Sequence, residues 1–489
     1  LAVVIRATAG LCEVVKRHAT GTPTLVVGCD ARYGSSEFAS AACRVASAAG
    51  VRVLALPQAN PTPLTAFSML HFDADAGVMV TASHNPAPDN GYKVYLGGTV
   101  VQGDGRGVQI VPPFDAEIAA AIEAAPPADE VPMNDDLIEA VDPREEYVAC
   151  ASALASGEAS AREDLRIVLT AMHGVGAAIT SRVLAEAGFS NVSLVAAQAD
   201  PDPDFPTVPF PNPEEAGALD MAIEQAREQG ADLIIAVDPD ADRCALAVPD
   251  PTSETGWSPL SGDQIGSLLG EFLASRGMKG SLANSIVSSR LLSRIARAHG
   301  LDHHTTLTGF KWIARAPGLG FGYEEAIGFC PDPAHVRDKD GIATSVVAAS
   351  LVAALKAQGC SVWDELERLA RLHGLHVSSP LTFRVEEIEQ IASGMARLRA
   401  QPPSVLAGSP VVEVSDLSQG YRGLPPTDGV LVLTEAGDRV IARPSGTEPK
   451  LKCYLEVILP VAEGEVLPWE QARERLDAIK AAFAEIIGL

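Results

Sequence analysis

The feature that most constrains the fold of this chain is an apolar run at residues 231–237, interrupted only by Asp232, which a polar loop follows directly. A strand without polar positions is typical of a sheet that is covered by helices on both faces. Comparable runs lie at residues 24–28, 77–80 and 165–169, and segments with apolar residues at helical spacing separate them. This alternation of short strands and helices predicts an α/β protein.

The pattern changes along the 489 residues and predicts several domains. We expect three α/β domains with mixed sheets and a C-terminal α+β domain, with boundaries at residues 1–150, 151–257, 258–374 and 375–489. Residues 111–162 suit a long helix plus a linker, and residues 214–229 suit a further helix.

Composition narrows the possible partners. The chain has 37 basic and 63 acidic residues, a net charge of −26, which argues against nucleic acid or an anionic membrane as a partner. The eight cysteines are scattered without zinc-like spacing, as expected for reduced thiols in a cytoplasmic protein. The longest apolar run, residues 345–355, is far too short to span a bilayer.

The polar loop at residues 81–86 follows one of the expected strands directly. Ser83 therefore lies where a strand ends, a usual place for a reacting group on a rigid support. Turn residues at 89–91 precede a second expected strand, which would return beside the loop and bring Lys93 near Ser83. Taken alone, these two side chains also suit an ordinary surface pair.

A second polar loop carries Asp238, Asp240 and Asp242. Alternate positions of an extended segment point the same way, so we expect the three carboxylates to converge. Clustered anions need a cation, and oxygen ligands favour Mg²⁺ or Ca²⁺ over zinc. Arg243 and Pro249 stand where an EF-hand requires Gly and Glu, which excludes that motif and favours Mg²⁺. A solvated acidic turn is the alternative.

The third loop contains Glu324 and Glu325 between glycines. Paired carboxylates can accept hydrogen bonds from vicinal sugar hydroxyls, and the basic residues that follow, His335, Arg337 and Lys339, can bind phosphate. A solvated helix start is the alternative interpretation of adjacent glutamates.

The fourth loop, residues 443–450, lies between two expected strands. Arg443 offers a guanidinium fork, Ser445 and Thr447 offer hydroxyl donors, and Gly446 permits close approach of the backbone. These features suit a cradle for a phosphate that is held without reacting. An ordinary hairpin turn is the alternative.

Together and in this order, the four loops resemble those of the α-D-phosphohexomutase family, which includes phosphoglucomutase and phosphomannomutase. The family patterns TASHNP, DGDGDR, GEES and RxSGTEPK correspond to residues 81–86, 238–243, 323–326 and 443–450. Residues 205–215 and 308–312 look closest to the branch that includes phosphopentomutase-like members.

The resemblance implies four domains around a central cleft and a mutase that interconverts sugar 1-phosphate and 6-phosphate. It implies a phosphoserine enzyme, a bisphosphorylated sugar intermediate that also serves as primer, and a monomer or weak dimer that acts on small sugar phosphates. It implies Mg²⁺ held by Ser83 and the three aspartates, and catalytic roles for Ser83, Lys93, His84 and Arg243. The substrate contacts that it implies are Lys311, Glu324, Glu325, His335, Arg337, Lys339, Arg443, Ser445, Gly446 and Thr447.

Three alternative functions stay open. A phosphopentomutase would use the same loops on a pentose phosphate, and a phosphatase would replace the sugar hydroxyl with water. A sugar-phosphate binding protein without turnover would need no metal-assisted phosphoserine, so intact Ser83 and Lys93 argue against it.

Two departures from the family pattern stand out. Ala326 replaces the usual Ser of the sugar loop, which removes one hydroxyl contact and bears on sugar specificity. The family's opening phosphate-contact motif has no counterpart, and the chain opens on Leu1 inside a helical pattern without a capping residue. We therefore expect that a segment precedes Leu1.

Overall fold

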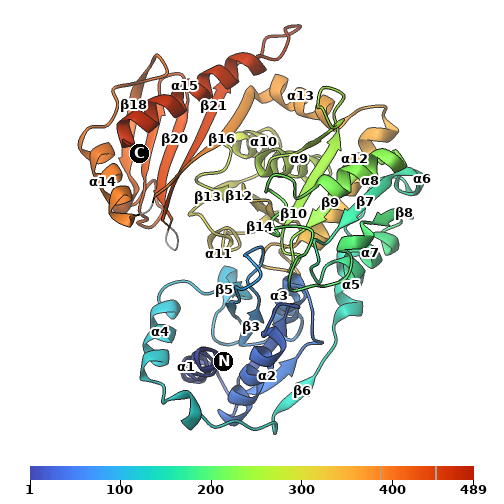
Figure 1. Ribbon diagram of the computed structural model, residues 1–489, viewed down its shortest axis with the longest axis vertical. Coiled ribbons are helices and arrows are strands. Elements are labelled where there is room, and N and C mark those ends of the chain that lie inside the picture. Colours follow the sequence, from blue (N-terminus) through green and yellow to red (C-terminus); the bar gives the residue numbers. More distant parts are fainter. Residues whose placement is uncertain (386, 446–448, 489) are drawn as a thin grey trace. The chain divides into compact units, whose positions relative to one another are not determined.

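A computed structural model describes residues 1–385, 387–445 and 449–488 (Figure 1). The chain forms two compact units. The first consists of residues 1–283 and 310–362, and the second consists of residues 284–309 and 363–489.

The first sheet of the first unit is mixed, with the strand order β5-β4-β3-β1-β2-β6. Its central strand pairs in parallel with β2 and β3, whereas β4 returns antiparallel to β3. Val78 packs in the same apolar core as Leu11 and Cys43, while Met69 covers Gly77 on the other face, so helices cover both faces. The strands are β1 (Thr24–Cys29), β2 (Arg52–Ala55), β3 (Ala76–Val80), β4 (Tyr92–Leu96), β5 (Val108–Gln109) and β6 (Ile138–Ala140), and the helices are α1 (Ala2–His18), α2 (Ser35–Ala48), α3 (Thr62–His71) and α4 (Phe114–Ala124).

The second sheet has the order β11-β10-β9-β7-β8. Strand β9 is the apolar run singled out in the sequence, and all five of its residues are buried. It pairs in parallel with β7 and antiparallel with β10, so the loop between β9 and β10 is a hairpin connection. The elements are α5 (Arg144–Ser152), α6 (Ala159–Asp164), β7 (Arg166–Thr170), α7 (Ala177–Glu186), β8 (Asn191–Leu194), α8 (Asp220–Gln229), β9 (Leu233–Val237), β10 (Cys244–Pro249) and β11 (Trp257–Pro259).

The third sheet has the order β13-β12-β14-β15. Helix α9 begins with a capping box, in which Ser261 and Gln264 exchange side-chain and backbone hydrogen bonds. Strands β14 and β15 form an antiparallel hairpin in which Glu324 lies opposite Gly328. The elements are α9 (Gly262–Ser275), β12 (Ser281–Ser285), α10 (Leu291–Ala298), β13 (His303–Thr306), α11 (Phe310–Ile313), β14 (Leu319–Glu324), β15 (Gly328–Cys330) and α12 (Gly341–Ala357).

The second unit contains an antiparallel sheet whose described strands follow the order β16-β21-β20-β19-β18-β17. Helices α14 and α15 pack together against it, and their Leu398, Leu476 and Phe483 share a core with Val457 of β21. The elements are α13 (Val362–His373), β16 (Leu375–Arg384), α14 (Ile388–Ala400), β17 (Val405–Leu406), β18 (Ser409–Asp416), β19 (Val430–Thr434), β20 (Arg439–Pro444), β21 (Lys450–Leu459) and α15 (Trp469–Ile487).

Two local predictions need correction. Residues 111–162 hold three short helices, α4 to α6, and the strand β6 in place of one long helix. Helix α8 begins only at Asp220, because residues 214–219 form turns and the side chain of Asn212 accepts the Glu214 amide hydrogen. Both segments are rich in Ala or acidic residues, which favour helix locally, but Pro and Gly residues interrupt them.

No single helix in the described residues has the length and apolar character needed to cross a membrane. Helices α12 and α13 would meet that test only as a pair that is sharply bent at their junction, and α12 is almost entirely buried in the protein.

Candidate active site

The loop that carries Ser83 leaves the buried strand β3, and β4 returns beside it with Lys93 opposite Met79. The predicted strand–loop–strand unit is therefore confirmed. Ser83 adopts a left-handed backbone conformation with φ of 50°, which is uncommon outside glycine, and its amide donates to Thr81 Oγ1 at 2.9 Å.

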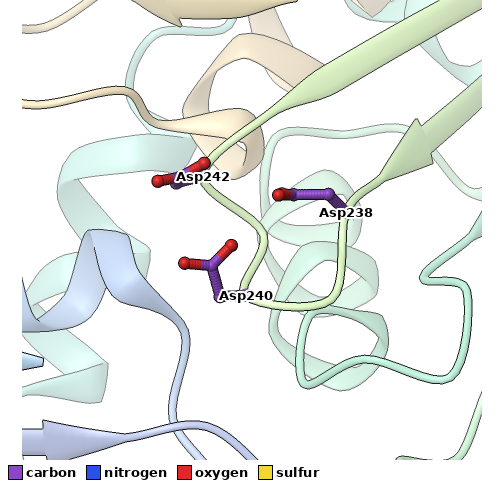
Figure 2. Close-up of side chains that lie close together, drawn as sticks. All are labelled: Asp238, Asp240 and Asp242. Carbon is purple, nitrogen blue, oxygen red and sulfur yellow. The ribbon is translucent and has the colours of Figure 1, made fainter. Parts of the chain in front are cut away.

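The three aspartates of the β9–β10 loop converge, as predicted. Asp238, Asp240 and Asp242 are buried, and each offers a carboxylate oxygen within 4.8 Å of the others (Figure 2). The expected cause was wrong: the segment is a turn and not an extended strand, because Ala241 has a left-handed φ of 56°. The turn brings the carboxylates to one side of the loop.

Ser83 points at this cluster. Its hydroxyl donates to Asp238 Oδ2 at 2.7 Å, and His84 Nδ1 lies 3.5 Å from the Ser83 oxygen and 4.0 Å from Asp238 Oδ2. Burial, aided by the charge of Arg243, lowers the pKa of His84 to about 3. His84 is therefore a neutral imidazole beside the Ser83 hydroxyl near neutral pH.

Two lysines neutralise the other carboxylates. Lys93 Nζ lies 2.7 Å from Asp240 Oδ2 and 2.6 Å from Asp242 Oδ2, and Lys339 Nζ lies 3.2 Å from Asp242 Oδ2 and 3.1 Å from Asp338 Oδ1. Burial alone would raise the pKa of Asp240, but the charge of Lys93 and its hydrogen bond hold that pKa below the ordinary value.

Asp238 has no lysine partner among the described residues. Burial and the neighbouring charges of Asp240 and Asp242 raise the pKa of Asp238 well above the ordinary value. Asp238, which accepts the hydrogen bond from the Ser83 hydroxyl, is therefore the aspartate of the three whose negative charge is least neutralised.

Arg243 links residues 238–242, here called the aspartate loop, to the predicted sugar loop at residues 323–326. Its Nη1 donates to Ala326 O at 2.7 Å, and its guanidinium lies 3.8 Å from Glu324 and 3.9 Å from Asp242. Glu324 is buried at the end of β14, and Glu325 follows it directly. The structure thus brings together the predicted residues Ser83, Lys93, Arg243 and Glu324 with the three aspartates.

The basic residues predicted to contact substrate do not behave as one group. The side chain of Lys339 is only 8% exposed and contacts buried carboxylates. His335 pairs with Asp332 at 2.7 Å, Arg337 donates to the Asp104 carbonyl at 2.6 Å, and Lys311 lies on the short helix α11.

The fourth loop belongs to the second unit. Arg443 lies near the end of β20, opposite Lys452 of β21, and the Ser445 amide donates to the Lys450 carbonyl at 2.8 Å. Gly446 and Thr447, also predicted to contact phosphate, lie outside the described residues.

Sequence reasoning missed three residues at this site. Thr62, at the start of α3, donates its hydroxyl to Asp240 Oδ2 at 2.6 Å. Asp338 accepts from Tyr95 and pairs with Lys339. The third is Arg32, which follows β1. For Thr62 the available signal was a polar residue at the first turn of a helix, and for Arg32 it was a polar residue shortly after a strand. Asp338 lies between β15 and α12 and offered no such signal.

Glycines support the aspartate loop from two other segments. A methyl group on Gly174 would lie 2.3 Å from the Cα atom of Pro239, and one on Gly341 would lie 2.3 Å from the Arg243 carbonyl oxygen. Such distances are far shorter than van der Waals contact, so bare backbone is required at both positions.

The hydrogen bonding of the aspartates also indicates a metal site, independently of their sequence pattern. The Oδ1 atoms of Asp240 and Asp242 are buried and have no hydrogen-bond partner in the part of the chain that the structure describes. Buried carboxylate oxygens without partners are costly, and clustered oxygen donors suit a divalent cation.

Comparison with known proteins agrees with this arrangement. Models of the phosphoglucomutase/phosphomannomutase family match as alpha/beta/alpha domain I at residues 1–128, domain II at 145–252, domain III at 261–371 and the C-terminal domain at 383–466. The chain therefore belongs to this family of phosphotransferase isomerases, and the predicted four-domain architecture is confirmed.

Individual relatives cover nearly the whole chain. A probable phosphomannomutase from Haemophilus influenzae is 44% identical over 93% of this chain and 92% of its own length. The phosphopentomutase of Homo sapiens is 30% identical over 99% of this chain and 85% of its own length. The crystal structure of a putative phosphomannomutase from Thermus thermophilus superposes with a TM-score of 0.74 at 25% identity, covering 98% of this chain and 94% of that one.

Proposed function

We propose that this protein interconverts the 1-phosphate and 6-phosphate of a hexose through a phosphoserine at Ser83 and a bisphosphorylated sugar. The observation that carries the proposal is the Ser83 hydroxyl, which lies on an intact TASHNP loop and donates to Asp238 at 2.7 Å. The 44% identity to a probable phosphomannomutase supports the hexose class.

The residues of the first unit suit distinct roles in this reaction. The phosphoryl group passes from Ser83 Oγ to a sugar hydroxyl and later returns from the other position of the bisphosphate. Lys93 is our candidate for relaying the hydroxyl proton: its ammonium group donates to Asp240 and Asp242, so it passes a proton to one of these carboxylates as it takes up the proton of the hydroxyl. Glu324 and Glu325 accept hydrogen bonds from sugar hydroxyls, and the guanidinium of Arg243 offsets the negative charges of Glu324 and Asp242. His84, whose pKa is lowered by burial, is in its neutral form a hydrogen-bond partner for Ser83.

We infer that the metal is Mg²⁺, held by Ser83, Asp238, Asp240 and Asp242. The ion stabilises negative charge on the transferring phosphoryl group. Carboxylate and hydroxyl oxygens favour it over zinc, and the Oδ1 atoms of Asp240 and Asp242, which accept no hydrogen bond from the described residues, offer ligand positions. A sugar bisphosphate is the expected primer, because Ser83 must be phosphorylated before the first turnover.

Other assignments follow the family resemblance. In the second unit, Arg443, Ser445, Gly446 and Thr447 are our candidates for binding the phosphate group that does not react. Lys311, His335 and Arg337 are further substrate contacts. We also propose the division into domains at 1–150, 151–257, 258–374 and 375–489, and a monomer or weak dimer in the cytoplasm.

A pentose phosphate is the second candidate substrate. Ala326 stands where the family's sugar loop usually carries Ser, and the human phosphopentomutase and a probable phosphoribomutase of Schizosaccharomyces pombe are 30% and 32% identical to this chain. The 1-phosphates of mannose, glucose, glucosamine, ribose and deoxyribose, each assayed with its bisphosphate primer, separate the two candidates.

Ser83→Ala tests the central step. We expect intact-mass analysis of the wild type to show phosphorylated protein, and the variant to lose both the phosphate and the isomerised product. Ser36→Ala, an exposed serine on α2, is the matched control and should keep both. Near-normal turnover in Ser83→Ala would refute the proposal, and release of free phosphate in place of an isomer would indicate a phosphatase.

A further inference from the structure

Carbonyl groups of the Ser83 loop converge on one buried residue, Arg32, whose side chain is 1% exposed. Nη2 donates to Ser83 O and Asn85 O, both at 2.6 Å, and Nη1 donates to Pro86 O at 2.9 Å and Asp89 O at 3.3 Å. Four of the five N–H groups of the guanidinium are therefore used on one loop.

The remaining side of the guanidinium is also enclosed. Arg32 Nε faces the buried carboxylate of Asp30 at 3.4 Å, and the Asp30 amide donates to Val80 O, the last residue of β3. The ring of Phe205 lies 4.9 Å from the guanidinium carbon. Arg32 is thus held by the sheet on one side and by an aromatic face on another.

These contacts bear on a strained residue. Ser83 has φ of 50°, and its own carbonyl accepts one of the two shortest hydrogen bonds from Arg32. A charged donor gives a stronger hydrogen bond than a neutral one, so it offsets the cost of this conformation. All four bonds go to main-chain oxygens, which leaves the Ser83 hydroxyl free to donate to Asp238.

We propose that Arg32 is a positioning residue that holds the backbone of the Ser83 loop in the conformation required for phosphoryl transfer. The inference rests on the proposed role of Ser83 as phosphoryl carrier. It requires the planar fork of arginine, because a lysine ammonium is a single point with three donors and cannot span four carbonyls.

The test is the rate at which glucose 1,6-bisphosphate phosphorylates dephosphorylated full-length protein, followed by intact mass. A displacement of about 1 Å at a reacting group can cost about 100-fold in rate, and we expect a loss of that order in Arg32→Lys. The half-saturating bisphosphate concentration should stay within about threefold, because Arg32 contacts the loop and not the ligand. A general loss of structure would change both quantities.

Arg52→Lys is the matched control, because Arg52 pairs with Glu139 at the exposed edge of the same sheet. It should leave the rate unchanged. Asp30→Asn is the second test variant: it keeps the four carbonyl contacts but removes the charge that faces Arg32 Nε, and we expect a smaller loss, about tenfold.

Wild-type rates in a folded Arg32→Lys protein would overturn the inference. If that variant does not fold, an unchanged rate in Asp30→Asn overturns it instead. The wild type distinguishes this outcome from a failure of the proposed function. If the wild type is phosphorylated and active and the phosphorylation rate of Arg32→Lys is unchanged, only the role of Arg32 is refuted. Wild type that never acquires phosphate refutes the role of Ser83.

Discussion

Replacing Lys339 with methionine tests the charge balance beneath the aspartate loop. The change keeps an unbranched apolar stem but removes the ammonium group that lies 3.1 Å from Asp338 and 3.2 Å from Asp242. Removing one partner of a buried ion pair typically costs about 3–5 kcal/mol. Asp242 keeps Lys93 and Asp338 keeps the Tyr95 hydroxyl, so we expect a loss near the lower end of that range.

Lys356→Met is the matched control. Lys356 also bridges two carboxylates, Asp164 and Asp232, each at 2.9 Å, but its side chain is 31% exposed compared with 8% for Lys339. Surface ion pairs are worth about 0–1 kcal/mol, so this variant should unfold almost like the wild type.

Urea unfolding at neutral pH, followed by circular dichroism, measures both free-energy losses. The buffer should contain a chelator, because a bound divalent cation would stabilise the remaining carboxylates. With a slope of about 2 kcal/mol per molar urea, a loss of about 3 kcal/mol lowers the midpoint by about 1.5 M. Equal losses of unfolding free energy in the two variants would refute the argument that Lys339 stabilises the fold more because it is buried.

Two further predictions concern metal and pH. Asp240→Asn should lower mutase activity by about 100-fold or more, and chelation should do the same to the wild type until Mg²⁺ is restored; full activity in excess chelator would contradict the metal assignment. Burial, with a smaller effect of His304, lowers the pKa of His303 from about 6.5 to about 4. Because the folded-state pKa is the lower one, this contribution to stability is complete above about pH 6.5 and is lost as the pH falls through about 4. His303→Gln should flatten that part of the stability curve in thermal unfolding, and an unchanged slope would show that His303 is not its source.

The local features of the fold were accessible from sequence because each depends on neighbouring residues. The apolar run at residues 231–237 predicted a buried strand, and β9 is that strand. The three carboxylates after it were predicted to converge, and they do. They converge through a turn at Ala241, which the sequence did not indicate because no glycine marks the left-handed position.

The remaining features depend on contacts between distant parts of the chain. Thr62 and Asp240 are separated by 178 positions, and Lys93 and Asp242 by 149. Lys339 is predicted to contact substrate because it is basic and follows the glutamate loop, but its ion pairs with Asp242 and Asp338 could not be read from the sequence. A single sequence contains no periodicity that pairs such residues, so their partners were found only in the fold.

Two glycines matter to the aspartate loop only because they have no side chain. Gly174 and Gly341 offer no functional group, yet a single added carbon at either would push against the segment that carries the carboxylates. A saturation mutagenesis screen scored on activity should therefore rank these glycines beside the aspartates themselves. Substitutions intended to alter the metal preference can therefore vary the carboxylate side chains. They cannot vary Gly174 or Gly341, because glycine is already the smallest residue.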